Sequence, residues 1–301
     1  MLKKTLTRLL ASALLICGLA VMPCAADAAA QNSVSLEYQH VRNATAKITY
    51  GGKTFLVDPF LAPKGAYPGF YTSLDRPNLR IPAIDMAEPA EKVIEGIDAV
   101  IVTHTHLDHW DPEAQMILPK NLPLFVQDSG DARLIRSQGF TDVRVVGVNT
   151  PFDGITITKT NGQHGTDTMY SHTDVAEILG DAMGFVLQKQ GLKTVYFAGD
   201  TNWNACVEHA IKKFQPDVIV LNTGYARIKW PDGEVFDGSL IMGTEDVLRA
   251  YNAAPKAEII AVHMDAVNHT MVSSDDLRQY VKAQNITCRV AIPREGETLE
   301  Y

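Results

Sequence analysis

Positive charge is scarce in this chain, which has 27 Lys and Arg against 35 Asp and Glu and a formal net charge of −8. An acidic balance of this kind argues against nucleic acid or an anionic membrane as the main partner. Cysteine is scarcer still, because only Cys206 and Cys288 lie beyond residue 30. A disulfide between these two and a pair of buried thiols are equally compatible with an exported protein.

The chain also lacks an apolar run long enough to cross a bilayer. Its longest run, Leu9 to Met22, is short of the ~20 residues that a membrane helix needs. Basic residues precede this run and small residues follow it, which predicts a signal peptide over residues 1–30, cleaved after Ala28 or Ala30. A retained anchor is the alternative. We expect an exported protein, periplasmic or secreted, with no stable membrane anchor and one domain over residues 31–301.

The order of the predicted elements is typical of an α/β protein. A strand over Val34–Gln39 and a hairpin over Ala44–Val57, with Gly51-Gly52 at its turn, open the chain. Strands and helices then alternate from Glu91 to a last strand over Cys288–Ile292. This pattern predicts two sheets, each covered by helices on one face.

Three imidazoles and a carboxylate lie within six residues in the segment His104-Thr-His106-Leu-Asp108-His109. The apolar run Ala99–Val102 before it predicts a buried strand, and Asp111 followed by Pro112 predicts the start of a helix. Composition alone would give this pattern in on the order of one such chain in a thousand. A bound cation is the most economical reason for so many titratable groups at one turn.

Three more residues of metal-binding type follow closely after apolar strands, namely His164, Asp200 and His263. Each is a weak signal alone, because a single histidine after a strand is more often hydrogen-bonded locally. Together with the first cluster they give five histidines and two aspartates. This is a ligand set of the size that two divalent ions need.

These motifs resemble the ordered ligand motifs of the metallo-β-lactamase superfamily, and the segment from Gly51 to Pro59 is similar to that superfamily's opening hairpin. The resemblance runs from about Val34 to the C-terminus and looks closest to the branch that holds uncharacterised Zn-dependent hydrolases and the ascorbate-6-phosphate lactonase. It implies an αββα sandwich with a dinuclear site at one edge. The Gly199-Asp200-Thr201 turn departs from true class B β-lactamases, which points away from antibiotic cleavage.

The resemblance also implies a role for each ligand. The first metal would be held by His104, His106 and His164, the second by Asp108, His109 and His263, and Asp200 would bridge them. His269 is the alternative last ligand, and we prefer His263 because it directly ends an apolar strand. His269 would then be a substrate-contacting or acid/base residue, or simply exposed. Asp58 would either accept a hydrogen bond from a ligand imidazole or cap its own turn.

Imidazoles and carboxylates without a thiolate suit two Zn²⁺ ions, and iron or manganese fits the same ligands. Two ions bridged by Asp200 would hold a water as hydroxide, since coordination lowers its pKa from ~15.7 to ~7. The residual charge of about +1 favours a carbonyl or phosphoryl electrophile. We expect hydroxide attack on an ester, lactone, amide or phosphodiester of a small molecule. The leaving-group acid would be His269, Tyr225 or metal-bound Asp108.

Three loops are expected to set specificity: Pro63–Pro89, Gly165–Asp181 and Tyr225–Met242. The second belongs to a longer polar loop expected over Asn161–Asp181. The first is either a cover over the site or a plain surface excursion. His172, Arg227 and Lys229 would meet an anionic substrate group or simply be surface residues. Two other functions remain open at this point: an iron-dependent oxidoreductase on the same scaffold, and a non-catalytic exported metal-binding protein.

Overall fold

Two β-sheets of seven strands each lie in the middle of the fold in this computed structural model, which describes residues 34–301. The first sheet contains, in spatial order, β14 (Thr298–Glu300), β1 (Leu36–Arg42), β2 (Thr45–Tyr50), β3 (Lys53–Val57), β4 (Ala99–Val102), β5 (Leu124–Val126) and β6 (Val143–Val145). The second contains β13 (Val290–Ala291), β12 (Glu258–Val262), β11 (Val218–Asn222), β10 (Val195–Phe197), β9 (Met183–Gln188), β8 (Ile155–Asn161) and β7 (Thr150–Phe152). The expected signal peptide lies outside the described residues.

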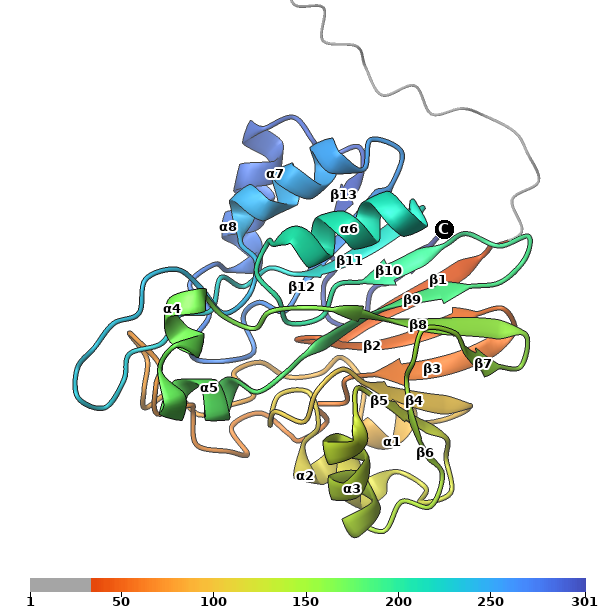
Figure 1. The fold of residues 1–301 in the computed structure, drawn as a ribbon, viewed down its shortest axis with the longest axis horizontal. Helices are drawn as coiled ribbons and strands as arrows, with labels where there is room; N and C mark the ends of the chain where they lie inside the picture. The colour runs from red at the N-terminus through yellow and green to blue at the C-terminus, as the bar shows by residue number, and fades with distance from the viewer. Residues whose placement is uncertain (1–33) are drawn as a thin grey trace, which may run out of the picture. The chain divides into compact units, whose positions relative to one another are not determined.

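Helices cover the outer face of each sheet (Figure 1). The first sheet carries α1 (Ala90–Val93), α2 (Pro112–Ile117) and α3 (Ser129–Ser137), and the second carries α6 (Ala205–Phe214), α7 (Thr244–Ala253) and α8 (Ser274–Ala283). One apolar core fills the space between the sheets, and one lies under each helix layer. The αββα sandwich that the resemblance implies is therefore confirmed. Within residues 34–301, no helix has the length and apolarity to cross a bilayer.

The site lies where parallel strands end. β3, β4 and β5 run parallel in the first sheet, as do β10, β11 and β12 in the second. Backbone hydrogen bonds from Met183 to Thr103 and from His263 to Asn43 tie the two sheets together at this edge. Polar residues that follow the strand ends are thus brought together, as is usual in α/β folds.

Two predicted elements are wrong. The loop expected over Asn161–Asp181 holds two short helices, α4 (Asp167–Tyr170) and α5 (Thr173–Leu179). Each has too few turns to show a helical period in the sequence. The chain also does not end with the strand over 288–292, because β14 follows it and pairs with β1.

The expectations for cysteine are also wrong. Cys206 is a free thiol at the start of α6, and both it and Cys288 are exposed. Neither a disulfide between these two residues nor a pair of buried thiols is present.

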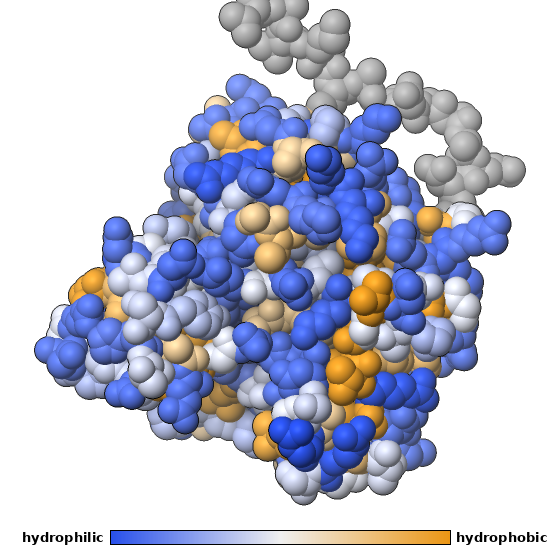
Figure 2. Space-filling view, in the orientation of Figure 1, coloured by the Kyte–Doolittle hydropathy of each residue, from blue (hydrophilic) through white to orange (hydrophobic). Residues whose placement is uncertain are grey.

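On the face drawn in Figure 2, the surface is largely hydrophilic and apolar residues lie in small separate patches.

Candidate active site

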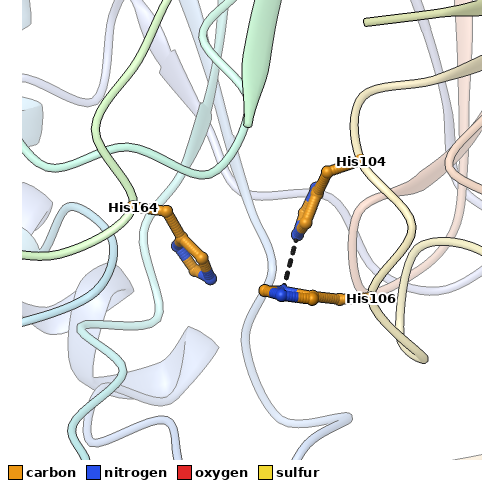
Figure 3. Close-up of side chains that lie close together, drawn as sticks. All are labelled: His104, His106 and His164. Atoms are coloured by element: carbon orange, nitrogen blue, oxygen red, sulfur yellow. Dashed lines mark hydrogen bonds between the residues drawn. The ribbon is translucent and has the colours of Figure 1, made fainter. Parts of the chain in front are cut away.

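The structure brings together all seven side chains that the sequence indicates as metal ligands. Three groups of ligand atoms each lie within 4.8 Å of one another: His104, His106 and His164; His104, His109 and Asp200; and Asp108, His109 and His263. The first group comes from two segments whose rings lie side by side (Figure 3). Every member of the seven is buried except His106, which is half-buried. The cluster therefore lies inside the protein, at the strand ends of both sheets.

Asp200 lies in the middle of this cluster. Its Oδ2 faces four imidazole nitrogens, at 3.2 Å from His109, 3.5 Å from His263, 3.8 Å from His164 and 3.9 Å from His104. Its Oδ1 accepts a hydrogen bond from Asn222 at 2.6 Å. One carboxylate oxygen is thereby fixed toward all four rings, which is the position that a bridging ligand needs.

Four of the five imidazoles have a local oxygen partner on one ring nitrogen. These contacts are His104 Nδ1 to Thr103 Oγ1 (3.1 Å), His106 Nε2 to the Ile178 carbonyl (2.9 Å), His109 Nδ1 to Asp58 Oδ2 (2.9 Å) and His164 Nδ1 to the Leu240 carbonyl (3.3 Å). A nitrogen that donates to such an oxygen leaves a lone pair on the other nitrogen of the ring. Histidines that bind metals are oriented in this way.

Asp58 organises the first motif from the end of β3. Its Oδ1 accepts from the backbone N–H of Thr103 at 2.7 Å, and its Oδ2 accepts from the Thr103 hydroxyl at 2.8 Å and from His109. The Thr103 hydroxyl is in turn the acceptor available to His104. The hydrogen bond that we predicted between Asp58 and a ligand imidazole is present, and one carboxylate orients two rings.

The donor set fits divalent metal ions. Nε2 of His109 lies 3.0 Å from Nε2 of His263, and Nε2 of His104 lies 3.0 Å from Nδ1 of His106. Since the outward nitrogens of His104 and His106 face oxygen acceptors, the short contact between these two rings brings two lone pairs together. A cation among the lone pairs turns this repulsion into coordination. Buried nitrogen and carboxylate donors without sulfur suit zinc, iron or manganese.

Two imidazoles and the central carboxylate have the protonation state of metal ligands, which must be deprotonated to bind. Burial lowers the pKa of His104 well below its ordinary value and that of His164 to about 3. Burial works against the charge of Asp200, but the His109 and His263 imidazoles hold its pKa well below the usual range. The carboxylate is therefore ionised, and His104 and His164 are neutral at neutral pH. Burial opposes the charge of His109 and His263, but the nearby carboxylates, Asp200 first, raise the pKa of both imidazoles, so a metal that binds them displaces their protons.

A small cavity of about 90 Å³ opens beside His106, Asp108, His164 and Asp200. Its remaining wall is mostly apolar and includes Phe70, Ile178, Leu179, Ile228, Trp230 and Leu240. All three predicted specificity loops contribute to this wall, so the segment Pro63–Pro89 borders the site. None of the described residues that line the cavity is Lys or Arg.

His269 lines the same cavity but belongs to none of the three ligand groups. Its ring packs edge-on against Phe70, with 4.7 Å between the ring centroids, and its buried Nδ1 has no hydrogen-bond partner. Burial lowers the pKa of His269 to about 4. The geometry thus separates a cluster member, His263, from a neutral cavity residue, His269, which is not exposed.

The residues expected to meet an anionic group do not line the cavity. His172 lies 3.5 Å from Glu234, Lys229 is exposed, and the Arg227 guanidinium donates to the carbonyls of Phe236 and Gly238. Tyr225 is also absent from the described cavity wall. The structure therefore brings none of these side chains to the site.

Sequence reasoning missed two asparagines. Asn222 donates a hydrogen bond to Asp200. The sequence does carry a signal for it, because Asn222 ends the buried strand β11, just as the metal ligands follow the ends of other apolar strands. Asn43 donates from Nδ2 to both the carbonyl and the Oδ2 of Asp108, each at 3.2 Å. It lies at the turn between β1 and β2 with φ of 57°, and no sequence signal marks it.

Comparison with known proteins gives consistent relatives. A family model described as "Beta-lactamase superfamily domain" matches residues 53–264. The chain is 39% identical over 262 residues to the UPF0173 protein YddR of Bacillus subtilis (strain 168), covering 87% of this chain and 98% of that protein. It is also 24% identical over 256 residues to a UPF0173 metal-dependent hydrolase of Myxococcus xanthus (strain DK1622). The match covers 82% of this chain and 77% of that protein.

Two solved structures are similar over most of their length. A possible metal-dependent hydrolase from Veillonella parvula DSM 2008 has a TM-score of 0.85 and 48% sequence identity, covering 88% of this chain and 99% of that one. An isothiocyanate hydrolase from Delia radicum gut bacteria has a TM-score of 0.82 and 42% identity, with the same coverage.

Proposed function

Because this chain belongs to the metallo-β-lactamase superfamily and, within it, to the UPF0173 metal-dependent hydrolases, we propose that it is an exported hydrolase with two metal ions. The enzyme is a metal-dependent hydrolase of small molecules, and the proposal adds the number and kind of ions, the bond and the location. We propose zinc for both ions. His104, His106 and His164 would hold one ion, Asp108, His109 and His263 the other, and Asp200 would bridge them.

One observation carries this proposal: Oδ2 of Asp200 faces four imidazole nitrogens from three separate segments of the sequence. When bound, two divalent ions supply Lewis acidity and lower the pKa of water to ~7. The chain's own part is to hold ionised carboxylates and neutral imidazoles in fixed orientations. Asp58, Thr103 and Asn222 do this through the hydrogen bonds described above.

The bond that we propose is one from an electrophilic carbon to a heteroatom, as in an ester, lactone or amide. The name of the gut-bacterial relative adds isothiocyanate, in which one water converts R–N=C=S into an amine and carbonyl sulfide. In each case the water oxygen joins the carbon and the bond from carbon to the heteroatom breaks. The heteroatom takes up one proton of the water in an ester, lactone or amide and both protons in an isothiocyanate. His269 is proposed to hydrogen-bond that heteroatom, since it is a buried imidazole in the cavity wall with an unpartnered nitrogen.

The test is turnover and metal content measured on the same preparation of full-length protein. A panel of p-nitrophenyl esters, lactones, amides, phosphodiesters and benzyl isothiocyanate is assayed after loading with zinc, iron or manganese. We expect about two ions per chain and zinc-dependent turnover of a carbon electrophile. Asp200→Asn should lower turnover at least 100-fold, and Asp217→Asn, a surface change away from the cavity, should not. Iron with visible absorbance and no hydrolysis would contradict the proposal and favour an oxidoreductase.

Export is tested separately. The expected signal peptide predicts a mature protein that begins at Ala29 or Gln31. The full chain is expressed in a bacterium with a periplasm, and the cells are fractionated. The compartment that contains the protein tests export, and its intact mass gives the cleavage site. Recovery in the cytoplasm with residues 1–30 retained would refute export without touching the proposed chemistry.

A further inference from the structure

The cavity beside the metal-ligand cluster has a mostly apolar wall, and one of its members is exposed. Ile178 is 48% exposed although it is a large aliphatic residue, and it lines the cavity with Ile228 and Trp230. Pockets that bind small molecules are lined mostly by apolar and aromatic side chains. We call Phe70, Ile178, Ile228 and Trp230 the tail wall.

Two of the three segments that form the tail wall, those of Phe70 and Ile228, are hydrogen-bonded to each other. Ser73 forms an isolated β-bridge with Ile228, and the N–H of Lys229 donates to the Thr72 carbonyl at 2.7 Å. The Asn268 side chain accepts from the N–H of Phe70 and donates to its carbonyl, both at 2.9 Å. These bonds hold both segments in place before any substrate binds.

A separate apolar core supports this wall from behind. It includes Met169 of α4, Leu179 of α5 and Phe236 and Leu240 of the segment 225–242. Leu179 and Leu240 belong both to this core and to the cavity lining. The carbonyl of Ile178 also contacts His106 at 2.9 Å, so the wall is connected directly to the ligand cluster.

We propose that the tail wall binds the tail of the substrate, and that the substrate is uncharged with a short apolar tail. This inference rests on the proposed function and narrows its substrate class. No cationic side chain among the described lining residues is available to an anionic tail. A cavity of about 90 Å³ is also much smaller than the ~300–1,000 Å³ of pockets for drug-sized ligands. A phosphate at the tail end of the substrate would therefore meet no opposite charge on this wall.

The test is a binding measurement on the zinc-loaded, full-length protein with metal-chelating hydroxamic acids. Calorimetry compares aceto-, butano- and hexanohydroxamic acid with an analogue of the last that ends in a carboxylate. Each buried methylene should tighten binding about four-fold until the cavity is full. The carboxylate-ended compound should bind at least ten-fold more weakly than hexanohydroxamic acid. Equal affinities along the series, or no penalty for the carboxylate, would overturn the proposal.

Two serine variants locate the effect. Ile178→Ser should reduce the gain in affinity from aceto- to hexanohydroxamic acid several-fold, because it removes apolar contact at the wall. Val148→Ser is the matched control, since Val148 is also an exposed aliphatic residue, 70% exposed, and does not line the cavity. A normal gain in Ile178→Ser would contradict the wall's role. If acetohydroxamic acid itself fails to bind, the proposed metal centre fails as well, so the two failures are distinguishable.

Discussion

At the scale of single residues, His263 and His269 lie close in sequence but in different surroundings. His263 faces Asp108 Oδ2 at 3.3 Å and His109 Nε2 at 3.0 Å, whereas His269 packs against Phe70. We expect His263→Ala to lose about one of two zinc ions per chain, because it removes a ligand of the second ion. His269→Phe should keep both ions and lose turnover at least ten-fold. Mass-spectrometric metal analysis checks this. Loss of zinc in His269→Phe but not in His263→Ala would mean that His269 is the metal ligand and His263 is not.

Asp58 provides a second residue-scale prediction. Replacing a group that orients metal-binding histidines typically costs 10–100-fold in metal affinity or activity. Asp58→Asn should therefore weaken zinc binding by about this factor, measured by competition with a chelator. Asp153→Asn is the control, because Asp153 has a similar left-handed backbone, with φ of 48° against 45°, and is paired with Lys53 at the surface. Equal zinc affinity in both variants would show that the hydrogen bond from His109 is unimportant.

The residue pattern predicts which side chains meet, because metal ligands follow apolar strands that end at one edge. It cannot predict their distances or partners. Asp58 contacts His109 only because β3 and β4 are adjacent and parallel, which the sequence does not specify. Asn43 reaches Asp108 through a turn 65 residues earlier in the chain. Such contacts depend on tertiary structure alone.

At the scale of elements, the Asn268 side chain is hydrogen-bonded to the loop around Phe70, which forms one wall of the cavity. Asn268 makes two hydrogen bonds with the backbone of Phe70 and one with the carbonyl of Arg76, at 2.9–3.0 Å. Asn268→Ala should leave the N–H of Phe70 without a partner, at about 1 kcal/mol, while the carbonyls of Phe70 and Arg76 keep the hydrogen bonds from Ser73 and Leu79. We expect faster hydrogen exchange over residues 69–76 and unchanged zinc content. Unchanged exchange in that segment would show that other contacts hold the loop.

Predictability differs among the elements for a physical reason. A continuous apolar run predicts β4 with its observed bounds, and the pair Asp111-Pro112 predicts where α2 begins. The helices α4 and α5 were missed because four and seven residues give too little periodicity, and their support comes from distant apolar residues such as Phe236. β14 is short and mostly polar and depends on pairing with β1.

At the scale of the whole molecule, one buried histidine outside the metal site makes stability depend on pH. His40 of β1 is buried, and burial lowers its pKa from 6.5 to about 4. The folded state therefore resists a proton that the unfolded state accepts below about pH 6.5. The neutral, buried His40 therefore costs no stability above pH 6.5. Below that pH the unfolded chain gains a proton that the folded protein does not, so the free energy of unfolding falls progressively toward pH 4. Linkage gives a loss of about 2 kcal/mol between pH 7 and pH 5.

The prediction is read as a difference between variants, since the metal-site histidines titrate in all of them. Urea unfolding of zinc-loaded protein at pH 7 and pH 5 should show a smaller drop in unfolding free energy for His40→Gln, by about 2 kcal/mol. His209→Gln removes an exposed histidine of α6 and should retain the full drop. A drop of the same size in His40→Gln would mean that His40 accepts its proton in the folded protein as readily as in the unfolded chain. In that case the folded protein must stabilise a charged His40 between β1 and its neighbours, although His40 is buried there.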